Sequence, residues 1–132
     1  MNDMPKGNQW DFIDRDDKSM YYGKNFRFDF NMFEAEQIRM LIKFYVWQNY
    51  KTGAVALRTI HTHCSSFRYF NTFCIENKIE SLVNIDTNTI DEYMTFLRLY
   101  KASRNGRTLK YVTQSGIFST FKMLVHWGQM YV

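Results

Sequence analysis

The residues best suited to chemistry are two histidines and two cysteines, at His61, His63, Cys64 and Cys74. A zinc site needs three or four such ligands that converge on one point. On a helix, His61 and His63 would point about 200° apart, so they could not share an ion. Cys64 falls on an apolar helical stripe, where a free thiol packs as a small hydrophobe. We therefore expect no metal site and no cofactor, and interpret these residues as parts of a packed helix.

Other catalytic patterns are missing or incomplete. The acidic residues Asp14, Asp16 and Asp17 lack the glycine and the closing glutamate of a calcium-binding loop, so they predict a solvated segment. The sequence contains no GxSxG, no glycine-rich phosphate loop and no HExxH. Because catalysis needs a nucleophile, a base and an orienting group brought together, we expect no catalytic site in these 132 residues.

A mixture of basic and short polar side chains points instead to nucleic-acid binding. A helix in the major groove needs Lys or Arg for the phosphates and short polar side chains for the base edges. The polar face of the helix expected over about residues 54–77 carries Arg58, His61, Thr62, Ser65 and Arg68. The last expected helix opens with Arg107, Thr108 and Lys110, and continues with Thr113, Gln114 and Lys122. The alternative is that both stripes simply face water.

The charge distribution favours an anionic partner. The formal net charge is +4, and residues 1–53 are neutral, with 8 Lys or Arg against 8 Asp or Glu. From Tyr93 onward the chain has no acidic residue, whereas this part contains Arg98, Lys101, Arg104, Arg107, Lys110 and Lys122. A solvated surface normally mixes both signs, so a long stretch of one sign suggests a negatively charged partner. The alternative is a basic face that only aids solubility.

The composition is that of a folded domain. Apolar residues make up 45% of the chain and aromatic residues 18%, far more than a disordered chain contains. Aromatic rings could stack on unpaired bases, but most of them fall on helical apolar stripes, which favours core packing. No apolar run approaches the roughly 18 residues of a membrane span, and no secretory signal opens the chain. Two cysteines make no disulfide framework, which favours a cytoplasmic location.

Hydrophobic periodicity predicts an all-α fold. Residues 1–30 are interpreted as an extended arm, because segment 26–30 alternates apolar and polar residues but no partner strand follows. The first helix is expected to be capped by Asn31 and to end at Gly53. Its polar residues, Arg39 and Lys43, are expected to be ordinary solvated surface.

Two more helices are expected after the one over residues 54–77, with N-caps at Asp86 and Thr108. Gly116, inside the last helix, suggests a close helix crossing. The apolar face of this helix comprises Val112, Ile117, Phe121, Leu124 and Val125. Because no capping signal precedes Val132, we expect the chain to be a fragment.

Three parts of the chain share the order and spacing of one known family. They are 56–70 (ALRTIHTHCSSFRYF), 82–86 (LVNID) with 90–97 (IDEYMTFL), and 121–127 (FKMLVHW). Together, over residues 33–127, they resemble the N-terminal core-binding, SAM-like domain of tyrosine recombinases, the family of phage integrases and related transposases. Segments 10–12 and 25–28 resemble the transposon-borne branch of this family.

The resemblance implies a four-to-five-helix SAM-like orthogonal bundle over residues 31–132, preceded by the arm of residues 1–30. The family's catalytic domain supplies an Arg, a His-x-x-Arg, a further His or Trp and a nucleophilic Tyr. That pattern is absent from this chain, so strand cleavage would belong to a parent protein. The domain itself would clamp a recombination half-site on double-stranded DNA through its second and fourth helices. Self-association on DNA would occur in the full-length protein.

The resemblance also suggests a role for each candidate residue. The phosphate contacts would be made by Arg58, Arg68, Arg104, Arg107, Lys110 and Lys122. The residues near base edges would be His61, Thr62, Ser65, Thr113 and Gln114. The competing hypothesis is a helical protein-interaction module with an acidic partner, or a stand-alone DNA-binding regulator, because a fold does not fix a function.

Overall fold

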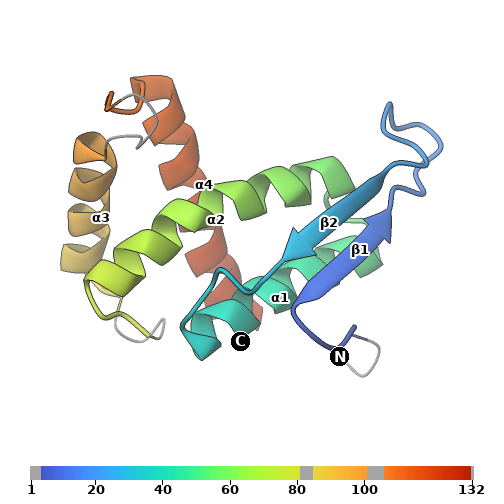
Figure 1. Cartoon of the computed structure of the whole chain (residues 1–132), viewed down its shortest axis with the longest axis horizontal. Coiled ribbons are helices and arrows are strands. Elements are labelled where there is room, and N and C mark those ends of the chain that lie inside the picture. Colours follow the sequence, from blue (N-terminus) through green and yellow to red (C-terminus); the bar gives the residue numbers. More distant parts are fainter. Residues whose placement is uncertain (1–3, 81–84, 101–105, 132) are drawn as a thin grey trace.

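The computed structural model describes residues 4–80, 85–100 and 106–131. It is mostly helical, as predicted: four helices contain 59% of the described residues, and a small two-stranded sheet precedes them. The elements, in chain order, are β1 (Gln9–Ile13), β2 (Asn25–Asp29), α1 (Glu36–Thr52), α2 (Leu57–Glu76), α3 (Thr87–Leu99) and α4 (Tyr111–Tyr131) (Figure 1). None of the helices in the described residues is long and apolar enough to cross a membrane.

The N-terminal segment is a β-hairpin, so the prediction of an unpaired extended arm was wrong. β1 and β2 pair antiparallel, with Trp10 opposite Phe28 and Phe12 opposite Phe26. The partner strand precedes segment 26–30, whereas the sequence analysis looked for one after it. Trp10, Phe12 and Phe28 are buried, while the alternate positions are exposed, so one face of the hairpin packs into the core.

Two basic residues of α1 bond backbone carbonyls on either side of the hairpin in the sequence. Lys43 is only 7% exposed, and its Nζ donates a hydrogen bond to the Gly7 carbonyl at 2.7 Å. Arg39 is half-buried and donates to the Phe33 carbonyl at 3.0 Å. The expectation that Arg39 and Lys43 form ordinary solvated surface was therefore wrong. Burial lowers the pKa of Lys43, and the nearby Arg39 charge adds to this effect.

The helix ends confirm two of the four expected caps. Gly53 ends α1 in the left-handed conformation, at φ 71°, and Asp86 caps α3 by accepting the Thr89 amide at 2.9 Å. Asn31 does not cap α1, which begins at Glu36, because the Asn31 carboxamide instead accepts a hydrogen bond from Asn8 at 3.0 Å. Thr108 does not cap α4, which begins three residues later at Tyr111.

The helices meet in an aromatic core. α4 packs across α2, where the Phe70 and Phe121 ring centroids lie 5.0 Å apart, and Tyr93 of α3 lies 4.6 Å from Phe121. Ile117, Phe121 and Leu124 are buried, as expected, but Val112 is 80% exposed and does not belong to this face. The close crossing predicted at Gly116 was also wrong, since a Cβ there would meet no atom within 4 Å.

Candidate nucleic-acid interface

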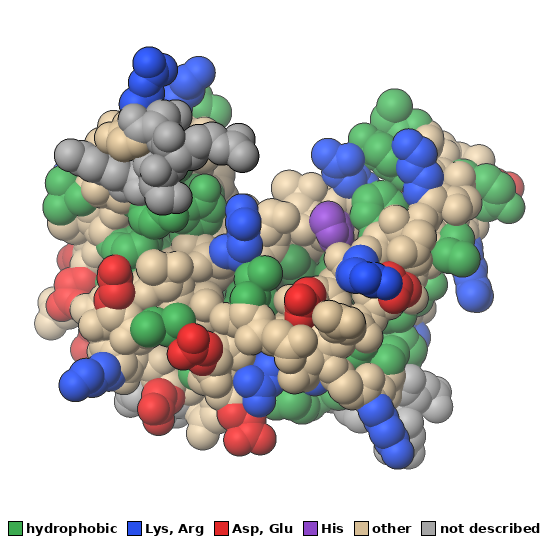
Figure 2. Space-filling view, viewed as in Figure 1, with side chains coloured by type: hydrophobic (Ala, Val, Ile, Leu, Met, Phe, Trp, Pro, Cys, Tyr) green, Lys and Arg blue, Asp and Glu red, His purple; other side chains and the backbone are tan. Residues whose placement is uncertain are grey.

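A hollow is visible in the space-filling view (Figure 2). In the ribbon view the hairpin lies on one side of this position, and the adjoining ends of α3 and α4 lie on the other (Figure 1). The exposed side of α2 lies between these two walls. In the space-filling view, Lys and Arg atoms occur on both sides of the hollow, while most of the visible acidic atoms lie below it (Figure 2).

The polar stripe of α2 faces away from the core. Arg58, Thr62, Ser65 and Arg68 are exposed, whereas the opposite side of the helix packs against α1 and α4. The Thr62 hydroxyl donates to the Arg58 carbonyl at 3.0 Å, and the Ser65 hydroxyl donates to the His61 carbonyl at 3.4 Å. Because its proton is used within the helix, the Ser65 hydroxyl oxygen is best suited to accept hydrogen bonds from donors on a ligand, whereas the Thr62 oxygen already accepts one from Arg58 Nε at 3.4 Å. Base amino groups are such donors, and phosphates are not.

His61, for which the resemblance suggests a base contact, also contacts the hairpin. Its Nε2 lies 3.0 Å from the carbonyl oxygen of Arg27 in β2, and since a carbonyl only accepts, the ring nitrogen donates. The imidazole also packs against Phe26 and Phe28, with ring centroids 5.5 and 5.3 Å away. His61 is therefore half-buried and fastens the hairpin to α2.

Arg58 also contacts the hairpin. Its guanidinium carbon lies 5.0 Å from the centre of the Tyr21 ring, a distance typical of a cation–π contact. The sequence did not reveal Tyr21 as a contact of the α2 stripe. No local signal could have done so, because the contact depends on how the hairpin docks.

The start of α4 forms part of the opposite wall. Arg107, Lys110 and Thr113 are exposed there, and Arg104 lies outside the described residues. Gln114 is half-buried, and its Nε2 donates to the Leu109 carbonyl at 2.8 Å, so its amide orders the start of the helix. Of the predicted residues at this end, Arg107, Lys110 and Thr113 present exposed side chains.

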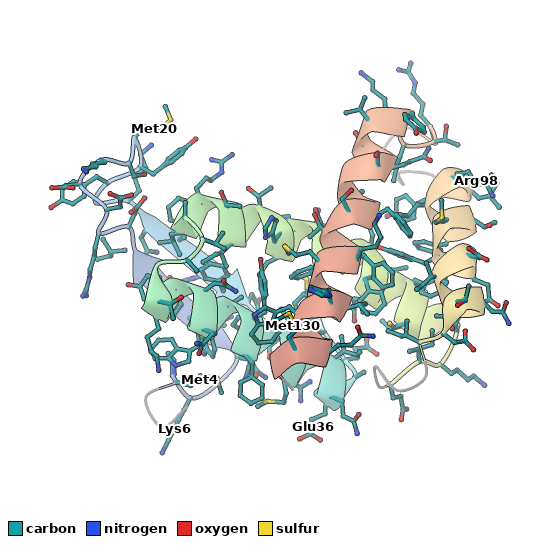
Figure 3. All side chains as sticks on the ribbon, turned by 180° about the vertical axis from the view of Figure 1, so that it is seen from behind. Met4, Lys6, Met20, Glu36, Arg98 and Met130 are labelled. Carbon is teal, nitrogen blue, oxygen red and sulfur yellow. The ribbon has the colours of Figure 1, made fainter. Side chains whose placement is uncertain are left out.

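Lys122 is not grouped with the α2 stripe. α4 crosses α2 on the side opposite this stripe, and the view from behind shows α4 in front of α2 (Figure 3). Lys122 lies midway along α4, where its Nζ is 5.3 Å from the centre of the Phe118 ring of the same helix. The start of α4 lies at the end of the molecule that adjoins α3 (Figure 1), whereas the middle of α4, near Phe121, packs on α2.

One ion pair joins the two strands of the hairpin. Among residues 4–80, 85–100 and 106–131, one salt bridge is present, between Arg27 Nε and Asp11 Oδ1 at 3.1 Å, and both side chains are largely exposed. Hydrogen bonds from Asn25 and Arg27 lower the pKa of Asp11. An exposed pair of this kind contributes little to stability, but it neutralises Arg27 locally.

The cysteines and histidines form no metal site in the described part of the chain. Burial raises the pKa of both thiols, that of Cys74 to about 12. A separate pocket of about 280 Å³ lies between β2 and α2, and its lining includes Ser65, Arg68, Phe30 and Phe33.

In comparisons with known proteins, no family model, no curated protein and no solved structure matches the chain.

Proposed function

We propose that this chain is a duplex-DNA-binding domain of the tyrosine-recombinase type, which holds a recombination half-site for a catalytic domain elsewhere in the parent protein. One observation carries the proposal: exposed cations occur on both sides of one hollow, and short polar side chains lie between them on α2. Phosphates would be held by Arg58 and Arg68 on α2 and by Arg107 and Lys110 at the start of α4.

The electrostatics favour a polyanion over a neutral partner. Every Lys or Arg that neutralises a phosphate releases condensed counterions, so affinity falls steeply as salt rises. A single module of this size would bury roughly 600–1,000 Å². Its binding to non-cognate duplex would lie around 10⁻⁴–10⁻⁶ M. A parent protein that self-associates on DNA would add affinity by linking several such modules.

The first experiment is a titration of a labelled duplex with the protein at several salt concentrations between about 50 and 200 mM. Replacing Arg107 and Lys110 with Ala should weaken binding and reduce the salt slope by about 0.9 for each phosphate that is no longer neutralised. The matched control replaces Lys6 and Lys51, which are also exposed, with Ala. Lys6 lies at the far side of the molecule from the hollow (Figure 3). Lys43 is unsuitable as a control because it is buried.

Two outcomes would count against the proposal. Undetectable binding at low salt would exclude duplex binding, and an equal loss of affinity in both double variants would indicate diffuse electrostatic attraction with no defined surface. The recombinase assignment is tested separately by reading the gene beyond codon 132. An Arg, a His-x-x-Arg and a Tyr in that order downstream are expected, and a stop codon at that point would contradict the assignment.

A protein-interaction module is the second candidate, and one observation favours it. Leu99, Tyr111 and Val112 are 70%, 81% and 80% exposed at the same end of the molecule as Arg107 and Lys110. Binding of an acidic protein partner there would be abolished by Tyr111→Ser and Val112→Ser, whereas duplex binding would survive both substitutions. DNA binding that depends steeply on salt would exclude this explanation for the basic surface.

A further inference from the structure

Two cations meet at one tyrosine where the hairpin joins α2. The Nζ atom of Lys24 lies 5.5 Å from the centre of the Tyr21 ring, and the guanidinium carbon of Arg58 lies 5.0 Å from the same centre. Phe26 packs against this ring edge-on, with centroids 6.0 Å apart, which fixes its position. Residues from two distant parts of the sequence are thus held around one aromatic side chain.

This cluster has excess positive charge. Neither Lys24 nor Arg58 forms a salt bridge within the described residues. Both lie within about one Debye length of each other, about 10 Å at 0.1 M salt, so their repulsion is only partly screened. The Tyr21 ring attracts each cation through its π face but does not cancel their charge. An anion bound between or beside them would relieve the repulsion.

The hairpin is firmly attached to the helices at this position. His61 of α2 bonds the Arg27 carbonyl at 3.0 Å, and the Asp14 amide bonds the Lys24 carbonyl at 2.9 Å across the strands. Lys24 and Tyr21 are therefore presented by an ordered backbone, which lowers the entropy lost when a ligand binds. The hairpin forms one wall of the hollow, and the start of α4 lies across it (Figure 1).

We propose that Tyr21 and Lys24 of the hairpin, together with Arg58 of α2, form a phosphate-binding site that holds the backbone of duplex DNA. The hairpin then forms a second DNA-contacting surface, opposite Arg107 and Lys110. This inference rests on the proposed function and extends it to an element that the sequence analysis treated as a packing arm. In this site Lys24 and Arg58 contact phosphate, and Tyr21 positions both cations.

The hairpin offers a matched pair of lysines for the test. Lys24 and Lys18 are both exposed and belong to the same hairpin, but Lys18 lies beside Asp16 and Asp17 in the sequence. Lys24→Ala should reduce the salt slope for a labelled duplex by about 0.9, whereas Lys18→Ala should leave it unchanged. Lys24→Glu should weaken binding further than Lys24→Ala, and Lys18→Glu should have a smaller effect. Thermal unfolding of each variant checks that the hairpin remains folded.

A second measurement locates the DNA directly. Cys74 is buried, but Cys64 is only partly buried, so an iron chelate is attached in a Cys64→Ala background to Asp17→Cys in the hairpin, to Ser115→Cys in α4 or to Glu36→Cys as a control. Glu36 lies on the far side of the molecule, whereas Met20 marks the hairpin tip (Figure 3). We expect duplex cleavage from the hairpin and α4 positions and none from the Glu36 position.

The outcomes separate the two proposals. One set of results would exclude the hairpin site and leave the proposed function standing. In that case the protein binds duplex, labelled Ser115→Cys cleaves it, labelled Asp17→Cys does not, and Lys24→Glu binds like Lys18→Glu. If the unmodified protein binds no duplex at low salt, both proposals are wrong. If Lys24→Glu weakens binding more than Lys18→Glu does, and labelled Asp17→Cys and Ser115→Cys both cleave the duplex, the hairpin site is established.

Discussion

Lys43 and His61 each bond a backbone carbonyl of the N-terminal segment, at Gly7 and Arg27. The two nitrogen donors lie on different helices, yet both stabilise the docked hairpin. Leaving such a carbonyl without its partner in a partly buried place costs about 1–3 kcal/mol. Both side chains lie on the polar side of a predicted helix. Their position in the sequence does not reveal that another segment covers them.

His63 gives a pH-dependent prediction. Its Nδ1 lies 2.6 Å from the Tyr45 hydroxyl, and burial lowers the pKa of this histidine. The unfolded chain, with an ordinary His pKa of about 6.5, therefore binds a proton more readily than the folded protein. By linkage, the free energy of unfolding should fall as the pH drops below about 6.5. Urea unfolding at pH 7.5 and 5.5 measures this change.

The matched variants are His63→Asn and His126→Asn. Both place an asparagine inside a helix, so both carry a similar propensity cost, but His126 is exposed on α4. His63→Asn should reduce the loss of stability between the two pH values, and His126→Asn should keep it. Equal pH dependence in the two variants would show that the Tyr45–His63 pair does not titrate in this range.

At the scale of elements, the long apolar stripes of the helices were predictable from the sequence, whereas two of the four expected helix caps were not. The buried stripe of α2 follows a period of three and four residues, which sequence alone reveals. The caps at Asn31 and Thr108 failed because residues of the right type are common, and Asn31 is bonded to Asn8 instead. β1 was missed because it has five residues and a long connection, without the Asn-Gly or Asp-Gly turn that indicates a tight hairpin.

The candidate interface was also only partly predictable from the sequence. Exposure of Arg58, Thr62 and Ser65 follows from the position of the apolar stripe. The contacts of His61 and Gln114 do not, because each depends on a segment whose placement is set by tertiary packing. The same reasoning explains why Lys24 was missed, since its neighbours around Tyr21 come from the docked hairpin.

Gly116 gives a prediction about α4. It is exposed inside the helix, and an added Cβ would meet no atom within 4 Å. Gly116→Ala should therefore raise the free energy of unfolding by about 1 kcal/mol, through helix propensity. Gly53→Ala is the contrasting variant, because Gly53 has φ 71° and no clash, so backbone strain alone should make it destabilising. Stabilisation by both variants, measured in urea, would contradict this assignment of the two glycines.

At the scale of the whole molecule, the hairpin and the helices share one core. Trp10, Phe12, Phe28 and Phe30 belong to the same buried cluster as the helix residues. The Phe12 ring stacks on Tyr50 of α1, with centroids 4.1 Å apart and planes 8° from parallel. The same hairpin that completes this core also forms one wall of the hollow (Figure 1). Stability and the shape of the proposed interface are therefore coupled.

This coupling predicts that a chain of residues 31–132 does not fold cooperatively. Burying an aromatic side chain of this size contributes roughly 1.5–3 kcal/mol, so the four hairpin rings together contribute about 6–12 kcal/mol. The net stability of a domain is only about 5–15 kcal/mol. Without the hairpin, the faces of α1 and α2 that it covers would be open to water, and the shortened chain should show no sharp unfolding transition in urea.

A variant of the full chain keeps this prediction testable if the shortened chain aggregates. Phe12→Ala removes one ring from the stack on Tyr50 and should cost about 3–5 kcal/mol, with an intact but less stable fold. Met20→Ala is its control, because Met20 is 85% exposed at the hairpin tip and should change little. A cooperative transition in residues 31–132, with Phe12→Ala as stable as Met20→Ala, would mean that the helices fold alone. The hairpin would then be an attached arm, as the sequence first suggested.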